Sequence, residues 1–151
     1  MKPMQSQRGV TLIELVVVMI IVAILAAVAI PSYRNYVLRS QRSDAKDALL
    51  ALATQQEKFY LQCNRYADVI AGAPNCAAGE LQGADTSENG WYDLVTDADP
   101  DPTLGFTATA TAAPGGNQAQ DTECETFQID DRGVRTALDS GGTDNTAECW
   151  R

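Results

Sequence analysis

The longest apolar run in the chain restricts its fold more than any other feature. Leu15–Ile30 contains 16 consecutive apolar residues, and from Val10 onward only Thr11 and Glu14 interrupt it. A helix that crosses a membrane needs about 20 predominantly apolar residues. The segment reaches that length only when the two polar residues are included, so their presence has to be explained.

A short, polar and basic segment precedes the apolar run. Residues 1–9 carry Lys2 and Arg8, and positive charge before an apolar helix keeps that end in the cytoplasm. Three interpretations are open: a cleaved secretory signal with a small-residue site at residues 26–29, a plain membrane anchor, or a processing site at the Gly9 junction.

Glu14 favours the third interpretation. A secretory signal or an anchor gains nothing from a carboxylate there, and an acid within lipid costs roughly 2.5–3.5 kcal/mol when it lies centrally. The structural alternative is a capping box, Thr11-x-x-Glu14, at the start of a helix.

Gly9 followed by VTLIELVVVMIIVAILAAVAIPSYRNYV resembles the N-terminus of type IV prepilins. The ending, Glu148-Cys149-Trp150-Arg151, is similar to minor pilins of the PilE type. The resemblance implies that a membrane-embedded prepilin peptidase cuts between Gly9 and Val10 and methylates the new amine of Val10. The family usually has phenylalanine at the position of Val10.

The resemblance also gives Glu14 a role in assembly. In a bundle of such helices the carboxylate of one subunit meets the positive N-terminus of another, and a buried charge pair of this kind can fix the register. Pro31 has no N–H and clashes with the preceding turn, so we expect a kink there. The family carries a proline at this place, where its filaments loosen the helix.

The helical pattern continues beyond the apolar run. We expect one helix from about Thr11 to about Gln62, since no glycine occurs between Val10 and Ala71. Its second half is amphipathic. The residues at three- and four-residue steps are Ala45, Ala48, Leu49, Leu52, Ala53, Gln56, Phe59, Tyr60 and Cys63.

The remaining sequence predicts a small antiparallel sheet. Strands are expected at residues 91–96, 104–112 and 122–130, and a turn at 131–133 leads to a short strand at 134–136. A small sheet must bury one face, so we expect it to pack on the amphipathic helix. The fold class is therefore α+β, and the resemblance implies the type IV pilin fold. Its parts are a leader (1–9), an apolar transmembrane or filament-core helix (10–31), an amphipathic half-helix (32–66) and a β-sheet head (67–151).

Four cysteines, Cys63, Cys76, Cys124 and Cys149, allow three disulfide connectivities. The pairs Cys63–Cys76 and Cys124–Cys149 are nearest in sequence and are favoured for that reason. The second pair would hold the tail against the last strands, as C-terminal disulfides do in many pilins. Close Cys-x-x-Cys pairs, which a zinc site needs, do not occur.

Charge divides the chain into a basic neck and an acidic head. Residues 32–67 carry six bases and three acids, whereas residues 68–151 carry 16 acids and three bases. Such a head repels phosphate, so general nucleic-acid binding is not expected. Arg34, Arg39 and Arg42 would contact lipid headgroups before assembly and acidic loops of neighbours afterwards, unless they simply solvate a helix face.

Catalysis and metal binding find little support. The sequence has no histidine, which excludes a Ser-His-Asp triad and His-containing zinc sites. Asp97, Asp99 and Asp101 have the alternate spacing of calcium ligands, but Pro100 and Pro102 interrupt a solvated acidic loop. We expect no cofactor and no metal.

The resemblance implies a structural, non-enzymatic minor pilin of a type IV pilus. Its partners would be other pilin subunits, prepilin peptidase, the inner-membrane assembly machinery and, before assembly, membrane lipid. It would lie in the bacterial inner membrane and then in an extracellular filament that serves adhesion or twitching motility. The alternatives are a type II secretion pseudopilin and a membrane-anchored periplasmic binding module that never polymerises.

Overall fold

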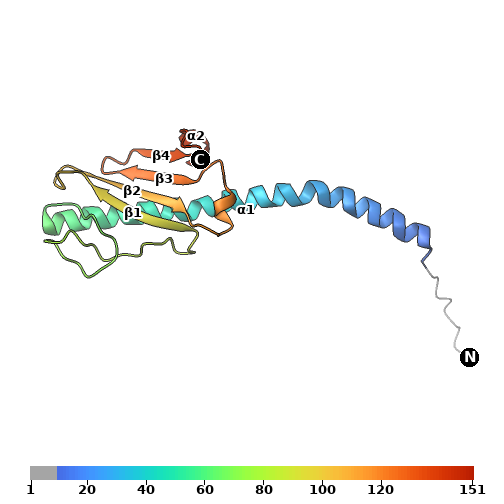
Figure 1. Ribbon diagram of the computed structural model, residues 1–151, viewed down its shortest axis with the longest axis horizontal. Coiled ribbons are helices and arrows are strands. Elements are labelled where there is room, and N and C mark those ends of the chain that lie inside the picture. Colours follow the sequence, from blue (N-terminus) through green and yellow to red (C-terminus); the bar gives the residue numbers. More distant parts are fainter. Residues whose placement is uncertain (1–9) are drawn as a thin grey trace, which may run out of the picture. The chain divides into compact units, whose positions relative to one another are not determined.

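The computed structural model describes residues 10–151 (Figure 1). The elements follow in the order α1 (Leu12–Cys63), β1 (Tyr92–Ala98), β2 (Phe106–Ala112), a 3-10 turn η1 (Gln118–Gln120), β3 (Thr126–Asp130), β4 (Arg135–Leu138) and α2 (Thr146–Cys149). The chain divides into two units between Val37 and Leu38. The leader lies outside the described residues.

Helix α1 has 52 residues and begins and ends within one residue of the expected positions. The helix continues through Pro31 without a break. Its end is explained by Asn64, which has a φ of 52° and donates its N–H to the carbonyl of Tyr60. Asparagine tolerates this left-handed conformation better than most residues and therefore stops helices.

The head unit, from Leu38 onward, contains an antiparallel sheet of four strands in the order β1-β2-β3-β4. Every neighbour in the sheet is also the neighbour in sequence, so the strands form a meander. Figure 1 shows them side by side along the second part of α1. Gly133, with a φ of 76°, makes the turn between β3 and β4, where Asp130 Oδ1 accepts the N–H of Val134 at 2.7 Å.

The period-two pattern of the strands buries one face of the sheet against the helix. In one cross-strand row Leu94, Ala110, Phe127 and Ala137 all point into the core. The helix contributes Ala45, Leu49, Leu52 and Phe59 to the same core. The amphipathic stripe of α1 is therefore buried against the sheet, as the sequence predicts.

One polar side chain joins helix, loop and sheet inside this core. Gln56 is fully buried, and its Nε2 donates to the carbonyl of Ala67 at 2.8 Å and to Thr96 Oγ1 at 2.7 Å. Its Oε1 accepts the N–H of Ala67 at 2.9 Å. A buried amide is tolerated only when it is paired in this way.

Tyr66 makes the stability of the head depend on pH in the alkaline range. Its ring packs on Tyr60 and Phe106, and its hydroxyl donates to Glu57 Oε1 at 3.2 Å. Burial first, and then the charge of Glu57, raises the pKa of Tyr66 to about 12. An unfolded tyrosine has a pKa near 10, so the folded state disfavours ionisation.

The stabilisation from neutral Tyr66 is complete below pH 10 and is lost as the pH rises toward 12. We expect the parent to lose more stability between pH 9 and pH 11 than Tyr66→Phe does, by about 1 kcal/mol. Urea unfolding of both proteins at the two pH values measures the difference. Equal losses would show that the ionisation of Tyr66 is not coupled to folding.

Candidate functional site

The first candidate site is the start of helix α1. Gly9, one side of the expected cut, lies outside the described residues. Val10 is 73% exposed, and every side chain from Val10 to Ile24 is exposed. Within the described part of the chain, α1 is the one helix long and apolar enough to cross a membrane. Such a surface in one molecule requires lipid or other apolar helices around it.

Thr11 and Glu14 form one half of a capping box. The N–H of Glu14 donates to Thr11 Oγ1 at 3.4 Å, one residue before α1 begins. This contact satisfies a backbone donor at the helix start. It uses the amide of Glu14 and not its exposed carboxylate, so capping does not by itself account for an acid at this position.

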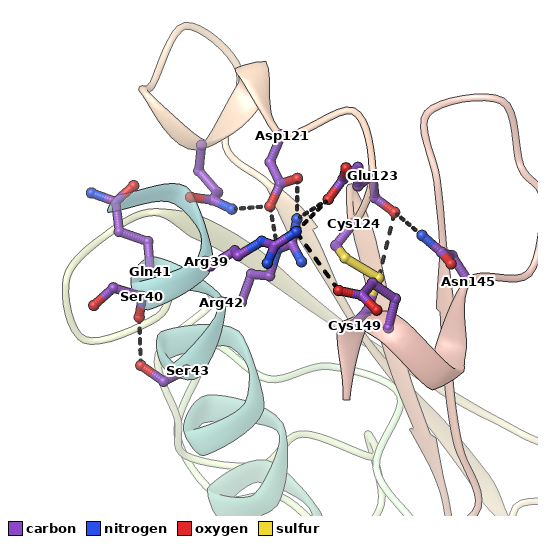
Figure 2. Close-up of polar contacts among 12 residues, drawn as sticks. Arg39, Ser40, Gln41, Arg42, Ser43, Asp121, Glu123, Cys124, Asn145 and Cys149 are labelled. Atoms are coloured by element: carbon purple, nitrogen blue, oxygen red, sulfur yellow. Dashed lines mark hydrogen bonds and ion pairs between the residues drawn. A yellow bond between two sulfur atoms is a disulfide. The ribbon is translucent and has the colours of Figure 1, made fainter. Parts of the chain in front are cut away.

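The second candidate site is an ion-pair cluster in the head (Figure 2). Arg42, from α1, reaches Asp121 with two bonds, Nε to Oδ2 at 2.6 Å and Nη2 to Oδ1 at 2.8 Å. Its Nη2 also donates to Glu123 Oε2 at 3.0 Å, and Gln118 Nε2 donates to Asp121 Oδ2 at 2.9 Å. Two parallel bonds of this kind are the strongest arginine–carboxylate geometry.

The cluster lies inside the protein. Arg42 is 5% exposed and Asp121 is 4% exposed. Burial lowers the pKa of Arg42, but the hydrogen bonds and charges of Asp121 and Glu123 outweigh it and raise the pKa above its ordinary value. Arg42 is therefore charged at every physiological pH, and it fixes the loop around Asp121 to helix α1.

This geometry corrects the expectation that Arg42 contacts lipid headgroups or a neighbouring subunit. The reason is that the apolar stripe of the helix includes position 42, so the guanidinium turns inward and finds acids of its own chain. Arg39 stays at the surface with 59% of its side chain exposed, and its Nη2 lies 3.9 Å from Glu123 Oε2 and 3.7 Å from Glu148 Oε1.

Two disulfides hold segments of the head together. The structure joins Cys63 to Cys76 and Cys124 to Cys149, the two pairs that are nearest in sequence. The second bridge links the loop before β3 to α2 directly beside the Arg42 cluster (Figure 2). Trp150 follows it and donates its Nε1–H to the carbonyl of Thr136 at 2.9 Å, covering the edge of β4.

The three acids with calcium-like spacing do not gather around one point. Asp101 Oδ1 accepts from Thr103, both from its N–H at 3.1 Å and from its Oγ1 at 2.7 Å. Asp97 lies on the exposed face of β1. Among residues 10–151 no group of three or more His, Cys, Asp or Glu side chains could hold a metal ion.

The apolar N-terminal helix and the four-stranded antiparallel head together define the class of type IV pilins. A family model for the prokaryotic N-terminal methylation motif matches residues 4–30. A second model, described as type IV minor pilin ComP, DNA uptake sequence receptor, matches residues 31–128. The chain belongs to this minor pilin family.

Three known proteins are similar to this chain in sequence or in structure. The type IV major pilin PilA of Myxococcus xanthus is 49% identical over 61 residues, which are 40% of this chain and 28% of that protein. The non-core minor pilin PilV of Neisseria meningitidis has a similar fold, with a TM-score of 0.51 and 18% identity over 72% of this chain and 93% of that chain. A pilin of Shewanella oneidensis has a TM-score of 0.46 and 21% identity over 65% and 89% of the two chains.

Proposed function

We propose that the chain is a minor subunit of a type IV pilus. Prepilin peptidase cuts it between Gly9 and Val10 and methylates Val10, and the assembly machinery then moves α1 from the inner membrane into the filament. The observation that carries this proposal is the exposed apolar surface at the start of α1, together with the N-terminal methylation motif that matches residues 4–30.

In the assembled filament, Glu14 pairs with the N-terminal amine of a neighbouring subunit. The apolar helix supports two successive locations for the protein. It is anchored in the inner membrane before assembly and is part of an extracellular filament afterwards. A type II secretion pseudopilin would share the leader, but the match to a minor pilin family and the two disulfides of the head favour the pilus.

The printed description of the family also names a DNA uptake sequence receptor. Our proposal for this chain does not extend to DNA. Residues 68–151 carry 16 acids and three bases, and all three bases are engaged within the head. Arg132 pairs with Asp130, Arg151 pairs with Glu148, and Arg135 lies over the ring of Trp150. Such a surface repels a phosphate backbone.

Gly9→Leu tests the maturation step. We expect almost no chains that start at Val10, because a bulky side chain before the cut obstructs the extended backbone that the peptidase must bind. Intact-mass measurement of the membrane protein distinguishes the two forms. Ser6→Leu places the same side chain elsewhere in the leader, and we expect it to be cut like the parent.

The alternatives give different results in the same experiment. A plain anchor keeps Met1 in the parent as well as in Gly9→Leu. A pseudopilin is cut after Gly9 but is missing from sheared pili. Normal yields of chains starting at Val10 from Gly9→Leu would contradict the prepilin assignment.

A further inference from the structure

The head contains a cleft whose lining includes no residue of the Arg42 cluster and none of the exposed apolar part of α1. It lies between the head part of α1 and the loop that precedes β1, and its volume is about 530 Å³. That volume is in the range of small-ligand sites. Asp44, Asp47, Ala48 and Leu52 line one side, and Glu88 and Trp91 line the other.

Asp44 lines this cleft, and one of its two carboxylate oxygens has no hydrogen-bond partner among the described residues. The residue is only 7% exposed. Its Oδ1 accepts from Asn89, from Nδ2 at 2.8 Å and from the backbone N–H at 3.4 Å. Its Oδ2 is buried and has no hydrogen-bond partner among the described residues. A buried carboxylate oxygen without a donor is costly, and a donor that enters the cleft would relieve that cost.

The other residues that line the cleft indicate that such a donor is positively charged and carries an apolar chain. Asp47 and Glu88 are exposed at the rim and add negative charge. Trp91 is half-buried, and the face of an indole ring attracts a cation. Ala48, Ala51 and Leu52 form an apolar wall, which suits methylene groups and offers no ligand to a metal ion.

We propose that this cleft binds an alkylammonium or alkylguanidinium group. The cation donates to the carboxylate of Asp44 beside the ring of Trp91, and its methylene groups lie along Ala48 and Ala51. The group is either a free amine or the side chain of a lysine or arginine in another protein. A divalent metal fits poorly, because among residues 10–151 no three acidic side chains come close enough to share one.

Butylguanidinium and butylurea test this proposal on the full chain in detergent micelles by isothermal titration calorimetry. The two probes have the same form, but only the first is charged. We expect butylguanidinium to bind at least about 10-fold more tightly than butylurea. N-acetyl-arginine amide represents a side chain within a protein: if it binds, a protein source is compatible, and if only butylguanidinium binds, the source is a free cation.

Three variants locate the binding. Asp44→Asn should weaken butylguanidinium binding about 10-fold or more, and the pair Asp47→Asn/Glu88→Gln should weaken it a few-fold. Asp93→Asn removes one exposed charge outside the cleft and should change binding less than 2-fold. The exposed rim pair keeps the test valid if thermal unfolding shows that Asp44→Asn is not folded.

Several results would overturn the proposal. If butylurea and butylguanidinium bind with equal affinity, the cleft recognises the shape and the apolar chain of the ligand and not its charge. Absence of butylguanidinium binding, or equal binding by the parent, Asp44→Asn and the rim pair, would remove the cation site. Calcium binding that requires Asp44, without guanidinium binding, would replace it by a metal site.

Discussion

Glu14→Leu is expected to enter the membrane and to be cut after Gly9, but to be at least about 100-fold depleted in filaments. Insertion should be as good as in the parent or better, because the substitution removes a charge from the apolar segment. Incorporation should fall because the N-terminal amine of a neighbour would enter an apolar bundle without its carboxylate. An unmatched partner of a buried pair costs about 3–5 kcal/mol, and each 1.4 kcal/mol is a factor of 10.

The measurement compares membrane fractions with sheared filaments by quantitative blotting. Thr11→Val is the matched control, since Thr11 Oγ1 accepts the N–H of Glu14 at 3.4 Å in the helix cap. Loss of a cap costs about 0.5–2 kcal/mol of helix stability but leaves the carboxylate in place. We therefore expect Thr11→Val to reach the filament at nearly the level of the parent.

The pair of variants separates the two explanations of Glu14. If both variants are depleted alike, the capping box accounts for the residue. If Glu14→Leu is incorporated like the parent, the charge pair and the filament assignment both lose their main physical argument.

The sequence predicts those elements of the fold that depend on local patterns. The sequence predicts α1 to within one residue at each end, because an unbroken apolar run continues into an amphipathic stripe with no glycine between Val10 and Ala71. The alternation in residues 106–112 gave β2. Where long-range contacts determine the structure, the observed strand boundaries differ from the expected ones. The strand expected from residue 122 starts at Thr126, because the disulfide at Cys124 and the acids at 121 and 123 form a loop against α1.

The Arg42 cluster shows why the sequence does not predict every residue of the candidate sites. Arg42 and Asp121 are 79 residues apart, and no local pattern connects them. A signal was nevertheless present in the helix. Arg42 lies three residues before Ala45, so it continues the stripe that includes Leu49 and Leu52. A charge on a buried stripe requires a partner, although its position does not identify Asp121.

The Arg42–Asp121 pair provides the second large effect. We expect Arg42→Met to destabilise the head by about 3–5 kcal/mol, because it leaves Asp121 buried at 4% exposure without its cation. Urea unfolding of the full chain in micelles, followed by near-ultraviolet circular dichroism, measures the change. Arg39→Met is the control: Arg39 is exposed and its ion pairs are at least 3.7 Å long, so it should cost at most about 1 kcal/mol.

The double variant Arg42→Met/Asp121→Leu determines what the pair contributes. Replacement of a buried ion pair by apolar residues is often neutral, whereas removal of one partner is costly. We expect the double variant to recover most of the stability that Arg42→Met loses. If it recovers, the pair mainly selects which loop docks on α1. If it remains as unstable as Arg42→Met, the bonds from Gln118 and to Glu123 make the cluster a net source of stability, and our expectation is wrong.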